Sequence, residues 1–191
     1  MNYADLLSTH EANNADVTIA GIPVADDVSS SFGIMRFDSA GRVKGFLEKP
    51  TTKAELDLVR TDPEWIEQAG IQAAGRSLMA SMGIYLFDRD CLLDLLLKTD
   101  YQDFGKEVFP AAIRAKHVQL HPFDGYWEDI GTIRSYYQCN IDLASSEPPF
   151  ELAAPHAPIY SRARFLPPSR VDGARVQGSL ISDGCTIGAG T

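Results

Sequence analysis

The stretch that decides the fold reads Leu78-Met-Ala-Ser-Met-Gly-Ile-Tyr-Leu-Phe87 and continues as Asp88-Arg-Asp-Cys-Leu-Leu-Asp-Leu-Leu-Leu97. Its first half is almost continuously apolar, which predicts a buried strand. Its second half carries leucines at helical intervals, and we expect Asp88 to be the N-cap of that helix. A strand that passes directly into a helix is typical of layered α/β proteins.

Alternating strands and helices continue on both sides of this stretch. A turn at residues 38–41 ends in Gly41, where a positive φ is expected, and it joins the two strands of a hairpin. The polar, proline-containing stretch 50–77 is predicted to be a surface insertion. The predicted fold class is therefore α/β, with helices over residues 3–12, 53–59, 104–116 and 132–144, and further strands over residues 16–24, 32–37, 42–48 and 117–123.

The composition changes near residue 145. Residues 146–158 hold four prolines and read as a linker. Beyond them, apolar residues recur at Val171, Val176, Ile181 and Ile187, which resembles the first coils of a hexapeptide β-helix. We therefore predict a domain over residues 1–145, a linker over 146–158, and the start of a β-helix over 159–191.

Charge and composition exclude several classes of function. A net charge of −9 argues against a nucleic-acid binder, because such proteins present basic surfaces. No apolar run approaches the ~18 residues of a membrane span, and no membrane association is expected. The three cysteines lack metal-ligand spacing and read as free thiols in a reducing compartment, so the protein is predicted to be cytoplasmic.

The string Phe46-Leu-Glu-Lys-Pro50 places a carboxylate beside an ammonium group. Pro50 favours the end of a strand here, and ligands in α/β proteins bind at such sheet rims. Glu48 could then accept hydrogen bonds from sugar hydroxyls, while Lys49 binds a phosphate. An exposed Glu-Lys pair without function is the alternative.

Three further positions allow a ligand as well as a structural role. Ser81, two residues before Gly83 in the apolar strand, could let a ligand approach the backbone closely or could simply be packed. Asp103, in Asp103-Phe-Gly-Lys106, could line a site or cap the following helix. Gly33 could form a bulge or contact a ligand through its backbone.

The string Gly125-Tyr-Trp-Glu-Asp-Ile-Gly131 combines an aromatic ring with a carboxylate. Trp127 offers a flat apolar face for a pyranose ring, and Asp129 offers a hard oxygen ligand for Mg²⁺. The alternatives are a core tryptophan and a helix-capping aspartate.

These motifs, followed by Pro158-Ile-Tyr-Ser-Arg-Ala-Arg-Phe-Leu-Pro-Pro-Ser169, resemble the glucose-1-phosphate adenylyltransferase (ADP-glucose pyrophosphorylase) family over essentially the whole chain. The resemblance implies a partial nucleotidyltransferase domain, Rossmann-like and GT-A-like, followed by a left-handed parallel β-helix. It also implies the reaction of ATP with α-D-glucose 1-phosphate to give ADP-glucose and diphosphate in glycogen or starch biosynthesis.

The resemblance assigns roles to residues. Lys49 and Asp129 would be catalytic, with Asp129 on the Mg²⁺ ion. The glucose 1-phosphate pocket would comprise Gly33, Glu48, Lys49, Ser81, Tyr85, Asp103, Phe104 and Trp127. The partners implied are glucose 1-phosphate and ATP, and the family assembles as homo- or heterotetramers.

The chain departs from the family pattern in one large respect. The glycine-rich G-G-G-x-G-T-R-L loop that binds ATP and the first metal-binding aspartate are not found among its 191 residues, and most of the β-helix is missing too. We therefore expect an internal fragment that is inactive alone and that self-associates through unpaired sheet edges. The alternatives are a non-catalytic regulatory or assembly subunit, a paralogue of the enzyme, and another sugar-nucleotide pyrophosphorylase.

Overall fold

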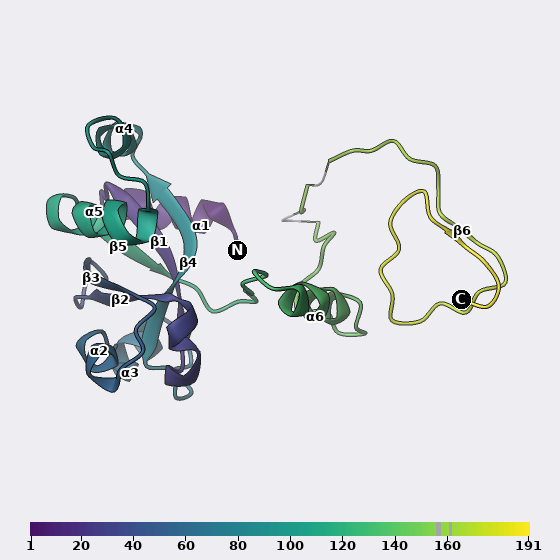
Figure 1. The fold of residues 1–191 in the computed structure, drawn as a ribbon, viewed down its shortest axis with the longest axis horizontal. Coiled ribbons are helices and arrows are strands. Elements are labelled where there is room, and N and C mark those ends of the chain that lie inside the picture. The colour runs from purple at the N-terminus through teal and green to yellow at the C-terminus, as the bar shows by residue number, and fades with distance from the viewer. Residues whose placement is uncertain (156–157, 161) are drawn as a thin grey trace. The chain divides into compact units, whose positions relative to one another are not determined.

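The computed structural model describes residues 1–191 except residues 156, 157 and 161, two of which fall in the predicted linker and one in the predicted β-helix (Figure 1). The chain divides into two compact units, residues 1–125 and 126–191. The first unit is built on a mixed sheet flanked by helices, and the second contains helix α6 and two short strands. In the part of the chain that the structure describes, no helix is both long enough and apolar enough to cross a membrane.

The sheet of the first unit has five strands in the order β3-β2-β4-β1-β5. Strand β5 runs parallel to β1, whereas the other neighbouring strands are antiparallel. All five strands predicted from the sequence are confirmed, namely β1 (Val17–Val24), β2 (Gly33–Phe37), β3 (Val43–Glu48), β4 (Leu78–Phe87) and β5 (Val118–Pro122).

Most of the predicted helices are also confirmed, and a short 3₁₀ helix (Asp26–Ser31) precedes β2. Asp88 occupies the N-cap position of α4 but makes no side-chain capping hydrogen bond, and its Oδ1 atom instead lies 3.4 Å from His10 Nε2. The predicted helix over 104–116 begins with a π turn, η2, before it becomes α-helical. The helices are α1 (Tyr3–Ala12), α2 (Lys53–Leu58), α4 (Arg89–Leu97), η2 (Phe104–Val108) and α5 (Phe109–Ala115).

The prediction that residues 50–77 form a surface insertion is wrong in part: most of the stretch is exposed, but several of its apolar side chains belong to the core. This stretch holds α2 and a second helix that was not predicted, α3 (Pro63–Gln68). Leu56 and Val59 are buried against the sheet, and Ile66 is completely buried. Helix α3 buries a single apolar side chain, Ile66, which is too little for helical periodicity to stand out in the sequence.

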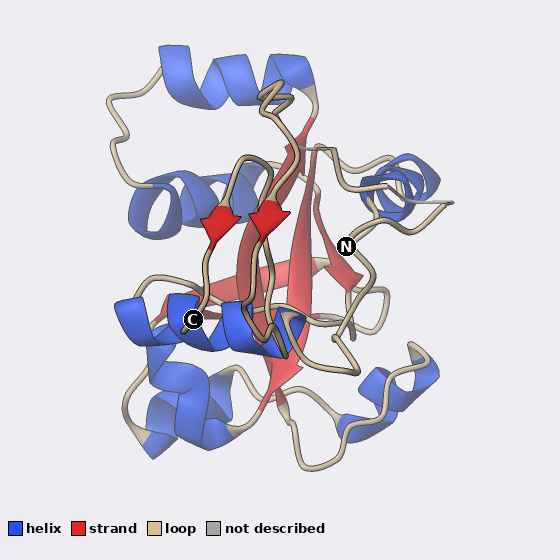
Figure 2. Ribbon diagram, turned by 90° about the vertical axis from the view of Figure 1, so that its right-hand side faces the viewer, coloured by secondary structure: helices blue, strands red, loops and turns tan. Residues whose placement is uncertain are grey.

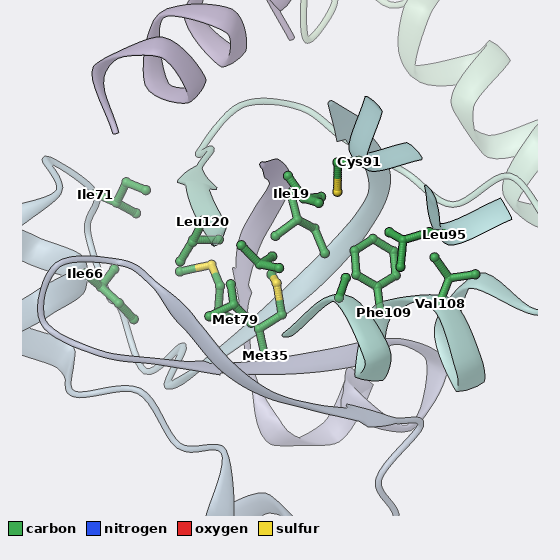
Figure 3. Close-up of a cluster of buried hydrophobic side chains, with 14 of the residues drawn as sticks. Ile19, Met35, Ile66, Ile71, Met79, Cys91, Leu95, Val108, Phe109 and Leu120 are labelled. Carbon is green, nitrogen blue, oxygen red and sulfur yellow. The ribbon is translucent and has the colours of Figure 1, made fainter. Parts of the chain in front are cut away.

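Side chains of the sheet alternate between two apolar layers, so both faces are covered. Met35 and Met79 face the layer that includes Phe109 of α5, seen in Figure 3. Ile34 and Leu78, one residue before each of these methionines, face the layer that includes Leu56 of α2. A sheet buried on both faces positions the strand ends rigidly, and the candidate site lies at such an end.

The second unit contains α6 (Ile133–Leu143), which begins where the sequence predicts, with Thr132 in a capping box. Two short strands, β6 (Arg170–Val171) and β7 (Thr186–Ile187), pair in parallel with Arg170 opposite Thr186 (Figure 2). Two strands of two residues each are too little to establish the predicted β-helix.

Candidate functional site

Strand β3 ends at Glu48, as the proline at position 50 predicted. Lys49 follows with a φ of 51°, and its backbone N–H donates to the carbonyl oxygen of Phe32 at 3.0 Å. This left-handed conformation is uncommon for a residue with a side chain, and here it turns the chain away from the sheet. Glu48 and Lys49 are therefore both exposed at the rim of the sheet.

A bulge in β4 brings Ser81 close to Tyr85. The pairing with β1 passes from Tyr85 opposite Ile19 to Ser81 opposite Gly21, and Gly83 between them has a φ of 70°. The Gly83 N–H donates to Ser81 Oγ at 3.2 Å, and the Tyr85 hydroxyl lies 3.4 Å from the same oxygen. Gly83 is thus required for its backbone conformation, which only glycine adopts without strain.

Asp103 caps the π turn, which is the structural role that the sequence left open. Its Oδ1 atom accepts a hydrogen bond from the Lys106 N–H at 2.8 Å, and Glu107 Oε2 accepts one from the Asp103 N–H at 3.0 Å. The turn is wide because the N–H groups of Val108 and Phe109 bond to carbonyl oxygens five residues back. A carboxylate that caps a helix still has further lone pairs, which can accept hydrogen bonds from a ligand.

The end of β3, the bulge of β4 and the π turn η2 come together near Gly105. A Cβ atom on Gly105 would lie 3.2 Å from Glu48 Oε2 and 3.5 Å from Asp103 Oδ1. The ring of Phe104 stacks on that of Tyr85, with centroids 6.3 Å apart and planes inclined by 13°. We call the residues that converge here the rim cluster, which consists of Glu48, Ser81, Tyr85, Asp103 and Phe104.

The rim cluster is negatively charged and carries a phenol that stays protonated. Burial raises the pKa of Tyr85, the hydrogen bond from Ser81 opposes this rise, and the charges of Glu48 and Asp103 add to it. Within the described residues, the Glu48 and Asp103 carboxylates form no ion pair with a lysine, arginine or histidine. The Lys49 ammonium group likewise forms no ion pair with an acidic side chain there. The cluster therefore combines free acceptors with a phenolic donor.

Gly33 has a packing role that the sequence did not reveal. It pairs regularly with Glu48, so it is not a bulge, and a Cβ atom here would lie 2.1 Å from the ring of Phe46. The missing side chain makes room for that ring, which also stacks on Phe109. Contact between the Gly33 backbone and a ligand stays a prediction.

Trp127 and Asp129 belong to the second unit. Trp127 is partly buried, and Asp129 is exposed with its Oδ1 atom accepting a hydrogen bond from the Gly131 N–H at 3.2 Å. Thr132, not Asp129, caps the following helix. In the described residues no group of three His, Cys, Asp or Glu side chains is arranged to hold a metal. The role of Asp129 as a Mg²⁺ ligand stays a prediction; Mg²⁺ is commonly held by one or two carboxylates, with phosphate and water oxygens as its other ligands.

A comparison with known families agrees with this mixed α/β architecture. The family model described as "Nucleotidyl transferase" matches residues 1–146, which include the whole sheet, the rim cluster and helix α6. The match extends over well over half of the chain. The chain therefore belongs to the nucleotidyl transferase family.

Proposed function

We propose that this chain carries the sugar-phosphate part of a glucose-1-phosphate adenylyltransferase, an enzyme that joins ATP and α-D-glucose 1-phosphate to give ADP-glucose and diphosphate. The rim cluster and Lys49 would form its glucose 1-phosphate subsite. The observation that carries the proposal is the meeting of Glu48 with Asp103 around Gly105, beside Tyr85 and next to an ammonium group without an acidic partner among the described residues.

The chemistry of this arrangement suits a phosphorylated sugar. Sugar hydroxyls can donate to the two carboxylates and accept from the Tyr85 phenol, so a polyol meets both acceptors and a donor. Lys49, one residue beyond Glu48, supplies the positive charge that the phosphate needs. A purely cationic ligand would leave Lys49 unused, and inorganic phosphate would meet two unfavourable negative charges.

The remaining assignments belong to the same proposal. Asp129 would be a ligand of Mg²⁺, which neutralises phosphate charge during nucleotidyl transfer, and Trp127 would contact the sugar. ATP as the nucleotide, the left-handed twist of the β-helix and a tetrameric assembly rest on the resemblance to the adenylyltransferase family. The division into residues 1–145, 146–158 and 159–191 rests on the change in composition near residue 145.

Titration of the protein with glucose 1-phosphate by calorimetry or NMR tests the subsite. Lys49→Ala should weaken binding by about 10- to 100-fold, because a charge-assisted hydrogen bond contributes roughly 1.5 to 3 kcal/mol. Lys44→Ala is the matched control on the same strand, where Lys44 Nζ pairs with Asp38 Oδ2 at 3.3 Å, and it should bind normally. An equal loss in both variants would contradict a phosphate role for Lys49.

The same titration separates the alternatives. Tighter binding of mannose 1-phosphate or N-acetylglucosamine 1-phosphate would indicate a different sugar-nucleotide pyrophosphorylase. A folded protein that binds none of these sugar phosphates would indicate a non-catalytic subunit.

A further inference from the structure

We infer that Gly105 is a positioning residue for the sugar: because it has no side chain, the Glu48 and Asp103 carboxylates can lie close to its backbone, where both can accept hydrogen bonds from a sugar hydroxyl. The inference rests on the proposed function, because it assumes that the rim cluster binds a sugar phosphate. It concerns a residue for which the sequence suggested no role.

The surroundings of Gly105 consist of carboxylate atoms. The three atoms nearest to a Cβ at this position are Glu48 Oε2 at 3.2 Å, Asp103 Oδ1 at 3.5 Å and Glu48 Cδ at 3.6 Å. All three are side-chain atoms of acidic residues. A methyl group at this position would therefore press first on the two acids.

The backbone gives no reason for a glycine at this position. Gly105 is absent from the residues with positive φ, so alanine can adopt its conformation. It is the second residue of η2, which continues into α5, and a glycine in a helix loses more conformational freedom on folding than an alanine does. The backbone conformation alone therefore favours alanine here.

The two carboxylates near Gly105 suit a hydroxyl group as hydrogen-bond donor. Asp103 Oδ1 already accepts one backbone N–H, and both carboxylates keep lone pairs that no cation of the described residues neutralises. A neutral donor between them satisfies these lone pairs without the cost of bringing in a further negative charge. The stacked rings of Phe104 and Tyr85 contribute an apolar surface to the same cluster.

A methyl group at position 105 would act on the ligand more than on the fold. Glu48 is exposed and flexible, so its carboxylate can retreat by a few tenths of an ångström to admit the methyl group. That shift lengthens the hydrogen bond to the sugar while the buried layers stay unchanged. Stability and affinity should therefore move in opposite directions.

The test is Gly105→Ala, with the thermal midpoint and the affinity for glucose 1-phosphate measured on the same preparation. We expect a midpoint equal to or above that of the unaltered protein and an affinity reduced about tenfold. Gly45→Ala is the matched control, because a Cβ there would meet only the flexible side chain of Arg36 at 3.4 Å, and it should leave the affinity unchanged.

A second variant shows whether the effect passes through Glu48. Glu48→Asp withdraws the carboxylate by one methylene group, so it should weaken binding less in the Gly105→Ala background than in the unaltered protein. Additive losses in this double-mutant cycle would overturn the inference.

The remaining outcomes separate the inference from the function on which it rests. Normal affinity in Gly105→Ala, or a lowered thermal midpoint together with lost binding, overturns the positioning role and leaves the subsite proposal standing. Failure of the unaltered protein to bind glucose 1-phosphate overturns the proposed function and the inference with it.

Discussion

At the scale of single residues, Gly33 illustrates how a glycine can be fixed by one neighbouring ring. Replacing it with alanine would place a methyl carbon 2.1 Å from the Phe46 ring, which is itself stacked on the fully buried Phe109. Because overpacking of this kind costs about 1 to 3 kcal/mol, Gly33→Ala should lower the free energy of unfolding by that amount in urea denaturation. Gly45→Ala in the same hairpin is expected to be nearly neutral, and equal losses would contradict the packing role.

The metal assignment of Asp129 leads to a prediction that needs no turnover. Mn²⁺ can replace Mg²⁺ and broadens the NMR signals of nearby nuclei, so signals around Asp129 should broaden on titration with Mn²⁺ in the presence of a nucleotide. Asp129→Asn should abolish this broadening, because an amide is a poorer ligand for hard cations. Glu128→Gln removes a neighbouring exposed acid and should preserve it. Broadening that follows Glu128 instead would refute the assignment.

The sequence reveals some of these residues and hides others for a physical reason. Pro50 marks the end of β3, and Asp103 carries the pattern of a helix cap, so local rules locate Glu48 and Asp103 correctly. The roles of Gly33 and Gly105 depend on which side chain lies opposite them in the folded chain. No local rule contains that information, because Glu48 and Gly105 come together only through tertiary packing.

At the scale of elements, the segment over residues 50–77 behaves as part of the core. Ile66 of α3 is completely buried, so Ile66→Ala should reduce the free energy of unfolding by about 2 to 5 kcal/mol. Leu58 of α2 is 67% exposed, and Leu58→Ala should change the free energy of unfolding by less than about 0.5 kcal/mol. A small effect of Ile66→Ala would restore the prediction of a surface insertion. The strands of the sheet were all predicted whereas α3 was missed, because long apolar runs leave a clearer signal in the sequence than a short helix with one buried side chain.

A contact between α1 and β5 should make stability depend on pH. His121 Nδ1 lies 2.7 Å from Thr9 Oγ1, and burial lowers the pKa of His121, an effect that the nearby Asp5 opposes. The unfolded chain therefore binds a proton more readily than the folded one. The contribution of His121 is fully present above its ordinary pKa of about 6.5 and is lost as the pH falls through its lower folded value.

The prediction is that acidification from about pH 7 to pH 5 lowers the free energy of unfolding less in His121→Gln than in the unaltered protein. Glutamine can keep a hydrogen bond to Thr9 but does not titrate in this range. Urea denaturation at several pH values measures the difference. Identical pH dependence in the two proteins would show that other groups dominate.

At the scale of the whole molecule, the hydrophobic core belongs to one unit. Among the described residues, every buried hydrophobic side chain lies between Leu6 and Leu120. We therefore expect the segment 1–125 alone to keep the far-ultraviolet circular dichroism of a mixed α/β fold and to unfold cooperatively. A segment that remains unfolded would mean that residues 126–191 complete the core.

Self-association, expected from the sequence, stays a prediction, but one edge of the sheet is poorly suited to it. Strand β3 forms that edge, and its pairing with β2 shifts register between Arg36 and Phe37, which leaves Lys44 as an extra residue in a bulge. Bulges and exposed lysines both discourage edge-to-edge pairing. Any association that sedimentation measurements detect is therefore expected to form chiefly through other surfaces.

The left-handed backbone of Lys49 has a consequence for protein engineering. A side chain at a φ of 51° is disfavoured by roughly 1 kcal/mol relative to glycine, so Lys49→Gly should make the protein more heat-resistant. The same change removes the ammonium group proposed to hold the phosphate. A directed-evolution library selected on heat resistance alone would thus enrich variants without the proposed phosphate contact, and a screen of this chain needs a sugar phosphate present during selection.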